Sequence, residues 1–235
     1  ESHLKIPAEK FATVEDGATL SLGGKTLEFF YTPWVHWPET MVTYLQEDKI
    51  LFSCDFFGSH FATSDLFADQ RIIYEPAKRY YAEIMMPFRA IIRKNLEIVD
   101  SLDLELIVPS HGPIFDDPSF IIDAYKDWSF DDVKNEVVIP FVSMHGSTRL
   151  MVDHLTDALI ARGIGVKRFD IAASDVGKIA EALVDAATLV LGACTVLAGP
   201  HPNAATVAIL ANALRPKTRF ASIVGSYGWG GKTVK

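Results

Sequence analysis

The segment VVIPFVSMHGST, residues 137–148, decides the fold of this sequence. Its first six residues are apolar, which predicts a strand buried on both faces, and its last six form a loop that leads into a helix over 148–161. Strand and helix patterns then alternate, with strands expected over 166–171, 188–193 and 219–224 and helices over 174–186, with Ser174 as N-cap, and 203–214. Strict alternation with apolar strands predicts a parallel, doubly wound sheet.

Three loops of this half follow strands, so they lie at the edge where doubly wound sheets bind ligands. The first loop offers hydroxyl groups, a glycine and a helix N-terminus, which suit one terminal phosphate, as in flavin mononucleotide (FMN). It contains neither G-x-x-x-x-G-K-[ST] nor G-x-G-x-x-G, so a nucleoside-triphosphate or dinucleotide site is not supported. The other loops offer small residues and aromatic rings that can contact a flavin. The expected FMN-binding residues are Ser143, Met144, His145, Gly146, Ser147, Thr148, Thr195, Val196, Leu197, Ala198, Gly199, Ser226, Tyr227, Gly228, Trp229 and Gly230.

The first half of the chain has a different pattern. Its strands are expected over 26–31, 41–46, 50–54 and 104–109. One long helix is expected over 75–102, irregular around Pro87, and a further helix begins at the N-cap Asp117 and ends near 127. A polar segment near 130–135 separates this pattern from the alternating one. We therefore expect two domains, residues 1–133 and 134–235.

Three potential metal ligands follow strands in the first half: His36, Asp55 and His111. Imidazole and carboxylate groups are ligands of zinc and of non-haem iron in proteins. The three residues are far apart in the sequence and form no local motif, but their shared position after strands predicts one metal site. His60 lies just beyond Asp55, where it either supports that site or packs within its loop.

The sequence resembles one known family at several places. The segments HWPE (36–39), FSCDFFG (52–58) and PSHG (109–112) resemble the later part of the metallo-β-lactamase-like domain of flavodiiron proteins. The segment VSMHGST (142–148) and the two later loops resemble the flavodoxin domain fused to it in that family. The resemblance covers nearly the whole chain. It implies an α/β protein with a partial metallo-β-lactamase-like αββα domain, followed by a flavodoxin-like doubly wound parallel sheet that is truncated at its C-terminus.

The resemblance also implies a chemistry. Members of the family carry FMN and two iron ions in a non-haem diiron site, and they reduce dioxygen to water, nitric oxide to nitrous oxide, or both. By the resemblance, His36 would ligate one iron, Asp55 would bridge both and His111 would ligate the second, so these three are the expected catalytic residues. The family's other ligand cluster, His-x-Glu-x-Asp-His, has no match in this sequence. We therefore expect a fragment of a longer protein that lacks both ends.

The resemblance further implies partners. The electron donor in the family is rubredoxin, reduced coenzyme F420 or a nicotinamide-linked reductase. A head-to-tail homodimer, or a dimer of dimers, is expected because the two cofactors of one chain are too far apart in the family for fast electron transfer. Two other functional classes stay open: a zinc-dependent hydrolase of the metallo-β-lactamase fold joined to a flavodoxin-like module, and a non-catalytic flavin electron carrier whose first domain is only a scaffold.

Composition excludes other classes of protein. The chain has 30 acidic and 22 basic residues, a net charge of −8, which makes it a poor ligand for nucleic-acid phosphates. No stretch reaches the roughly 18 uncharged apolar residues of a membrane span, so no membrane partner is expected. Cys54 and Cys194 each end an apolar run, which predicts buried free thiols and a reducing, cytoplasmic location.

Overall fold

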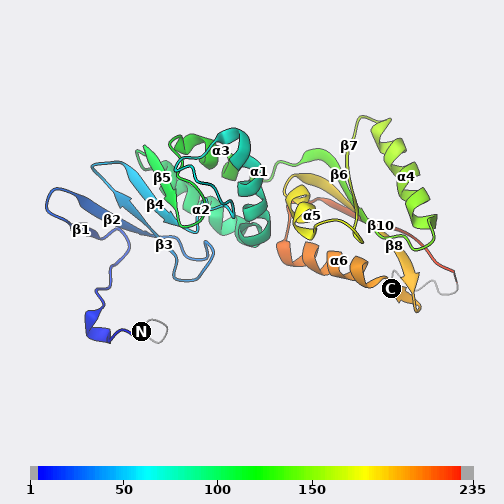
Figure 1. Ribbon diagram of the computed structural model, residues 1–235, viewed down its shortest axis with the longest axis horizontal. Coiled ribbons are helices and arrows are strands. Elements are labelled where there is room, and N and C mark those ends of the chain that lie inside the picture. Colours follow the sequence, from blue (N-terminus) through cyan, green and yellow to red (C-terminus); the bar gives the residue numbers. More distant parts are fainter. Residues whose placement is uncertain (1–4, 229–235) are drawn as a thin grey trace.

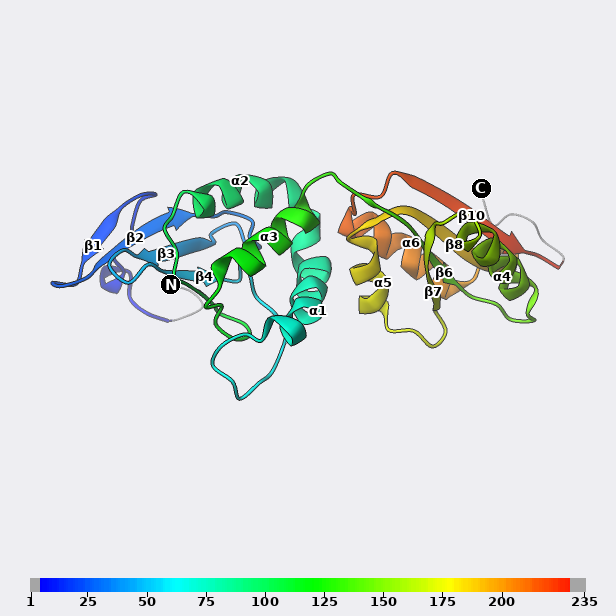
Figure 2. The same cartoon turned by 90° about the horizontal axis from the view of Figure 1, so that it is seen from above.

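The computed structural model describes residues 5–228 and contains two sheets that lie side by side along the long axis of the molecule (Figure 1). The first sheet has the strand order β1-β2-β3-β4-β5, and the second has the order β10-β8-β6-β7, with the short β9 paired to β8. Figure 2 shows the helices of the two halves meeting between the sheets, where α1 faces α5. The expected α/β class is confirmed.

The first sheet is antiparallel except at one edge. Its strands are β1 (Thr19–Ser21), β2 (Thr26–Tyr31), β3 (Met41–Leu45), β4 (Ile50–Cys54) and β5 (Leu106–Pro109). Neighbours from β1 to β4 pair antiparallel, whereas β5 pairs with β4 in parallel. Strands β2, β4 and β5 therefore run in the same direction and end at the same edge of the sheet.

Helices pack on one face of this sheet. They are α1 (Gln70–Tyr80), a π-helical segment (Tyr81–Met85), a 3₁₀ segment (Met86–Phe88), α2 (Arg89–Asp100) and α3 (Pro118–Ser129), and a short 3₁₀ turn, Ala8–Lys10, precedes the sheet. Aromatic side chains fill the core between them, with Tyr81, Tyr125 and Trp128 in mutual ring contact. The other face stays accessible, because Leu51 and Ser53 of β4 are buried while Phe52 and Cys54 point outward and are exposed.

Two predictions for this half are wrong. The long helix begins at Gln70 rather than at residue 75, because the Asp69 carboxylate caps it by accepting from the Arg71 amide. The expected irregularity around Pro87 is confirmed, since a π-helical and a 3₁₀ segment interrupt the helix there. Proline has no amide to donate to the preceding turn, so the helix widens there before α2 resumes. Cys54 is exposed rather than buried, because strand alternation places it on the uncovered face. Both cysteines are free, and Cys194 is buried as expected.

The second sheet is parallel throughout its main path. Its strands are β6 (Lys134–Phe141), β7 (Gly165–Asp170), β8 (Ala186–Val196), β9 (Gly199–Pro200) and β10 (Phe220–Ser226). The helices are α4 (Ser147–Ile160), α5 (Val176–Leu183) and α6 (Pro202–Leu214), and Figure 1 shows α4 on the opposite face of the sheet from α5 and α6. Alternate residues of β6 enter separate cores: Val137 and Ile139 pack with Val152 of α4, whereas Val138 packs with Ile179 of α5.

This order makes β6 and β8 the pair at which the chain reverses its winding direction, which is where flavodoxin-like sheets bind their ligand. The predicted strand and helix pattern is confirmed with shifts at the ends of elements. Ser174 is not the N-cap of α5: the Asp175 carboxylate accepts from the Gly177 amide and α5 begins one residue later, at Val176. Among residues 5–228, no helix is both long and apolar enough to cross a membrane.

Candidate functional site

The topology of the first sheet brings the three predicted metal ligands together. His36 lies in the loop after β2, Asp55 directly follows β4, and His111 comes two residues after β5. These strands end at one edge of the sheet, and the Ser110 amide joins the ends of β4 and β5 by donating to the Cys54 carbonyl at 2.7 Å. Residues that are far apart in the sequence therefore share one small region of the surface.

Asp55 lies between the two histidines. Its Oδ2 is 3.4 Å from His36 Nε2, and its Oδ1 is 3.3 Å from His111 Nε2. The Asp55 side chain is 15% exposed and that of His111 is 49% exposed, so the cluster opens to solvent on the His111 side. Each oxygen of one carboxylate thus faces a different imidazole, an arrangement in which the carboxylate can bridge two metal ions while each histidine binds one.

These three side chains do not surround a single ion by themselves. Within residues 5–228, no group of three or more His, Cys, Asp or Glu side chains is arranged to hold a metal ion. The donor set fits a shared carboxylate between two metal positions, with one imidazole at each, and it leaves most of each coordination sphere to other ligands. The residues present therefore fit part of a dinuclear site.

The backbone around the cluster is tightly held. The Ser59 amide donates to the His111 carbonyl at 3.0 Å, and the Gly58 amide donates to the Asp55 carbonyl at 3.2 Å. Gly112 has a φ of +92° and lies so close to Ser59 that a methyl group on its Cα would overlap Ser59 Oγ. Glycine is needed at this position for both reasons.

Two aromatic side chains stand beside the cluster. The Tyr80 hydroxyl donates to the Asp55 carbonyl at 3.1 Å, and burial together with the nearby Asp55 charge raises the pKa of Tyr80 well above its usual value. His60 contacts Tyr80 edge-on, with ring centroids 4.9 Å apart, and its ring lies 5.7 Å from that of His111. His60 therefore packs against the site as well as against its own loop, while Tyr80 is a site residue that the sequence did not single out.

The predicted flavin loops surround a cavity of about 390 Å³ at the carboxyl edge of the second sheet. Nine predicted residues line it, and the sequence missed one lining residue, Cys194, at the C-terminal part of β8. The nine are Met144, His145, Ser147, Thr195, Val196, Leu197, Ser226, Tyr227 and Gly228. Trp229 and Gly230 lie outside the described residues.

The other described residues predicted to bind FMN do not line this cavity, and three of them hold its loops in place. Gly146 has a φ of +87° and its amide donates to Ser143 Oγ at 3.1 Å, which sets the turn before α4. The buried Thr148 hydroxyl is 2.9 Å from Ser226 Oγ, so the first turn of α4 is joined to the end of β10. Ala198 lies in the β8–β9 turn and Gly199 begins β9, and neither residue lines the cavity.

Apolar side chains flank the cavity and reach into solvent. Leu197 is 85% exposed and Tyr227 is 70% exposed, and both line the same opening. A flat aromatic ring system could pack between such side chains while the N-terminus of α4 and the hydroxyls of Ser147 and Ser226 receive a phosphate. The chemistry of these residues fits FMN.

Comparisons with known proteins agree with this geometry. Residues 2–112 match the model of the ODP family beta lactamase. The chain is 37% identical over 231 residues to a nitric oxide reductase of Moorella thermoacetica, covering 96% of this chain and 58% of the relative. It is 35% identical over 232 residues to a coenzyme F420H2 oxidase of Methanothermobacter marburgensis, covering 94% of this chain and 57% of the relative.

Solved structures extend the likeness to the whole fold. The rubredoxin oxygen:oxidoreductase of Desulfovibrio gigas superposes with a TM-score of 0.93 at 31% identity, covering 99% of this chain and 60% of that one. The flavodiiron protein of Giardia intestinalis superposes with a TM-score of 0.88 at 30% identity, covering 95% of this chain and 56% of that one. The chain thus spans somewhat more than half the length of each of these four proteins. Because one continuous match includes both sheets and both candidate sites, the chain belongs to the flavodiiron protein family.

Proposed function

We propose that this chain works in a flavodiiron oxidoreductase, in which FMN passes electrons to a non-haem diiron site that reduces dioxygen to water, nitric oxide to nitrous oxide, or both. In this proposal residues 1–133 form the metallo-β-lactamase-like domain and residues 134–235 the FMN-binding domain. The observation that carries the proposal is the Asp55 carboxylate, whose two oxygens each face one histidine at 3.3–3.4 Å, in the same chain as a cavity suited to a flavin.

The residues have distinct roles in this proposal. His36 and His111 would each hold one iron, and Asp55 would contribute to both metal positions. Iron and flavin supply the one-electron chemistry that amino-acid side chains lack. Tyr80 keeps the Asp55 backbone in place through its hydroxyl, and the loops after β6, β8 and β10 hold the FMN.

Metal and flavin analysis of the purified protein tests the proposal. We expect iron and a yellow flavin chromophore. Asp55→Asn should lower the iron content and keep the flavin, because an amide is a poor bridge between two cations, and Asp153→Asn, on the surface of α4, is the matched control. Protein that binds zinc but no iron would instead support the hydrolase, and protein that binds neither flavin nor metal after reconstitution would refute both.

Exposed apolar side chains near both sites support a head-to-tail homodimer, or a dimer of dimers. Trp34 and Trp37 lie on either side of His36 and are 46% and 57% exposed, and Leu197 and Tyr227 flank the flavin cavity. A second copy could cover the metal side of one chain with the flavin side of the other. Sedimentation analysis tests this state: a monomer that retains full activity would refute it.

The names of the relatives suggest the electron donors to test. We propose rubredoxin or reduced F420, with a nicotinamide-linked reductase as the third candidate, and each can be assayed by its own absorbance change under dioxygen or nitric oxide. We also propose a cytoplasmic location, which the two free cysteines support.

A further inference from the structure

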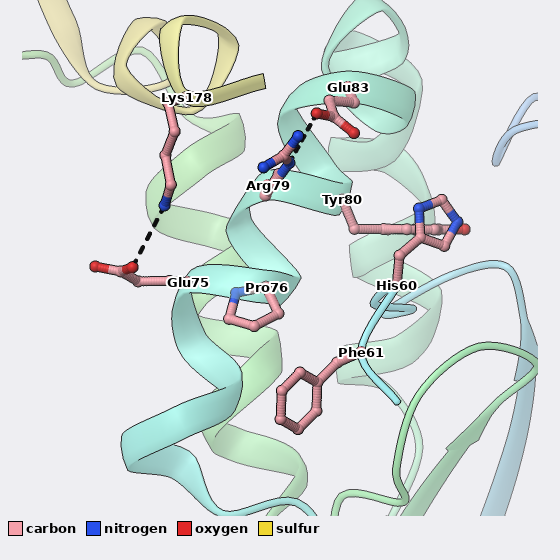
Figure 3. Close-up of a pocket in the computed structure, with 8 residues that line it drawn as sticks. All are labelled: His60, Phe61, Glu75, Pro76, Arg79, Tyr80, Glu83 and Lys178. Atoms are coloured by element: carbon pink, nitrogen blue, oxygen red, sulfur yellow. Dashed lines mark hydrogen bonds and ion pairs between the residues drawn. The ribbon is translucent and has the colours of Figure 1, made fainter. Parts of the chain in front are cut away.

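A cavity of about 440 Å³ lies where α1 meets α5, beside the metal-site residues. Figure 3 shows His60, Phe61 and Tyr80 on one side of it, Arg79 turned toward Glu83, and Lys178 of α5 reaching down to Glu75. These charged side chains are paired with one another rather than open to a ligand, since Arg79 Nε is 2.9 Å from Glu83 Oε1 and Lys178 Nζ is 3.5 Å from Glu75 Oε2. The Lys178–Glu75 pair therefore connects the two halves of the chain.

Arg79 also pairs with Asp175 of the second half through two hydrogen bonds. Arg79 Nη1 donates to Asp175 Oδ2 at 2.6 Å, and Arg79 Nη2 donates to Asp175 Oδ1 at 3.1 Å. Two parallel hydrogen bonds between guanidinium and carboxylate fix both distance and orientation. The same Asp175 carboxylate accepts from the Gly177 amide at 2.8 Å as the N-cap of α5. One carboxylate thus begins a helix of the second half and holds α1 of the first half.

The junction is buried next to this pair. Lys78 Nζ donates to Asp185 Oδ2 at 2.5 Å, and these side chains are only 9% and 2% exposed. Ala180 and Val184 of the second half belong to the same apolar core as Ala77 and Tyr81 of the first half. The two halves are therefore packed together along α1 rather than joined only by the segment between α3 and β6.

Tyr80, which follows Arg79 in α1, contacts the metal side. The Tyr80 hydroxyl donates to the Asp55 carbonyl, which also accepts from the Gly58 amide. Lys78, Arg79 and Tyr80 are consecutive, so one helical turn contacts Asp185, Asp175 and the backbone of Asp55.

We propose that Arg79 is a positioning residue that couples the second half of the chain to the metal side: paired with Asp175, it fixes the turn of α1 from which Tyr80 holds the Asp55 backbone. The coupling is a property of the protein without its cofactors. Its failure can therefore be distinguished from a failure of the proposed function.

Hydrogen exchange of the full chain, followed by mass spectrometry on peptides that contain residues 55–59, tests this proposal. In Arg79→Ala we expect exchange of the Gly58 amide to become about fivefold faster, the equivalent of one ordinary hydrogen bond. Asp175→Asn should produce a similar change while α5 keeps its N-cap, because asparagine caps helices as well as aspartate does. Arg71→Ala is the matched control, since Arg71 lies on the same helix but pairs with Asp69 of its own half.

Two double variants test the order of the contacts. Tyr80→Phe should accelerate the same exchange, and Arg79→Ala added to Tyr80→Phe should accelerate it no further. The Arg79→Ala and Asp175→Asn effects should likewise not add. Exchange in Arg79→Ala that equals that of Arg71→Ala, or effects that add independently, would overturn the proposal.

Gly177→Ala keeps the proposal testable where Arg79→Ala does not fold. A methyl group at Gly177 would overlap the Arg79 guanidinium and the Glu83 carboxylate, which are movable ends of long side chains, and alanine favours the helix itself. This variant should keep its secondary structure and still exchange faster at residues 55–59. Unchanged exchange there in a folded Gly177→Ala protein would show that Arg79 does not position the metal side.

Discussion

Replacing Gly112 with alanine tests whether the turn after β5 holds His111 beside Asp55. Gly112 directly follows His111, has a φ of +92°, and leaves no room for a methyl group because Ser59 Oγ occupies that space. The positive φ costs an L-residue about 1–2 kcal/mol. Overlap in a packed region costs a further 1–3 kcal/mol or so. We therefore expect Gly112→Ala to lower the free energy of unfolding by roughly 2–5 kcal/mol.

Gly163→Ala provides the matched control. Gly163 also has a positive φ, +73°, but no atom lies within 4 Å of the position of an added methyl group. This control should lose only the backbone contribution of about 1–2 kcal/mol. The double variant Gly112→Ala/Ser59→Ala should regain most of the overlap energy, because Ser59 Oγ is buried and has no hydrogen-bond partner among the described residues.

Urea unfolding and iron titration measure the two consequences. Any movement that relieves the overlap shifts the turn carrying His111, so we expect iron affinity to fall by about tenfold or more in Gly112→Ala and to stay unchanged in Gly163→Ala. Equal unfolding free energies for the two single variants, or unchanged iron affinity in Gly112→Ala, would refute the idea that the contact between Gly112 and Ser59 positions His111.

Three further predictions concern the junction and the flavin cavity. Lys78→Met leaves the buried Asp185 with the half-exposed Lys134 as its one lysine partner among residues 5–228, so calorimetry should show a loss of about 2–3 kcal/mol, less than the 3–5 kcal/mol of a fully unpaired buried charge. Lys126→Met, which breaks the exposed pair with Asp100, should cost less than about 1 kcal/mol. Burial opposes ionisation of Asp185, but hydrogen bonds from its two lysines outweigh this and lower its pKa below the usual value. The stabilising effect of ionised Asp185 should therefore be complete above about pH 4 and disappear as the pH falls through the lowered pKa of the folded state. Unfolding of Asp185→Asn measured against pH checks this, because the variant should lack this acid-sensitive part of the stability. Thr148→Val removes the hydrogen bond between α4 and Ser226 and should weaken FMN binding by about tenfold in a fluorescence titration, whereas an unchanged affinity would show that this bond does not shape the cavity.

The sequence predicted the second half well because its signals are local. The apolar residues of β6 face two covered sides, so residues 137–141 form one uninterrupted apolar run, and the central strand β8 is apolar in the same way. The loops that end these strands meet at one edge by topology alone, which is why nine of the predicted flavin residues line one cavity. The errors lie at the ends of elements, as at Ser174 and Asp175, where two neighbouring residues can both serve as N-cap, and at the two-residue strand β9, which lies in a segment expected to be a loop.

The first half was harder to predict because its decisive signals are not local. An apolar run suggested that Cys54 is buried, but only one face of its sheet is covered, and no residue near Cys54 in the sequence reports this. The convergence of His36, Asp55 and His111 followed from the positions of the strands, whereas the contact of Tyr80 with the Asp55 carbonyl depends on how α1 crosses the sheet. Arg79 and Asp175 pair although they are 96 positions apart, and no local sequence pattern around either residue predicts this ion pair.

The packing between α1 and the second half affects how electrons would pass from the proposed flavin to the proposed metal site. A hinge that swung the flavin cavity toward Asp55 would have to separate the buried Lys78–Asp185 pair and open the apolar contact of Ala180 and Val184 with α1. Both steps expose groups that the folded chain keeps from water, so closure within one chain is opposed at the junction itself. A fixed junction therefore supports the proposed head-to-tail homodimer, in which the metal side of one copy would meet the flavin side of another. Rapid mixing with reduced flavin tests this proposal. The rate of flavin oxidation should fall as dilution dissociates the proposed dimer, and a rate independent of protein concentration down to the monomer would show that one chain suffices.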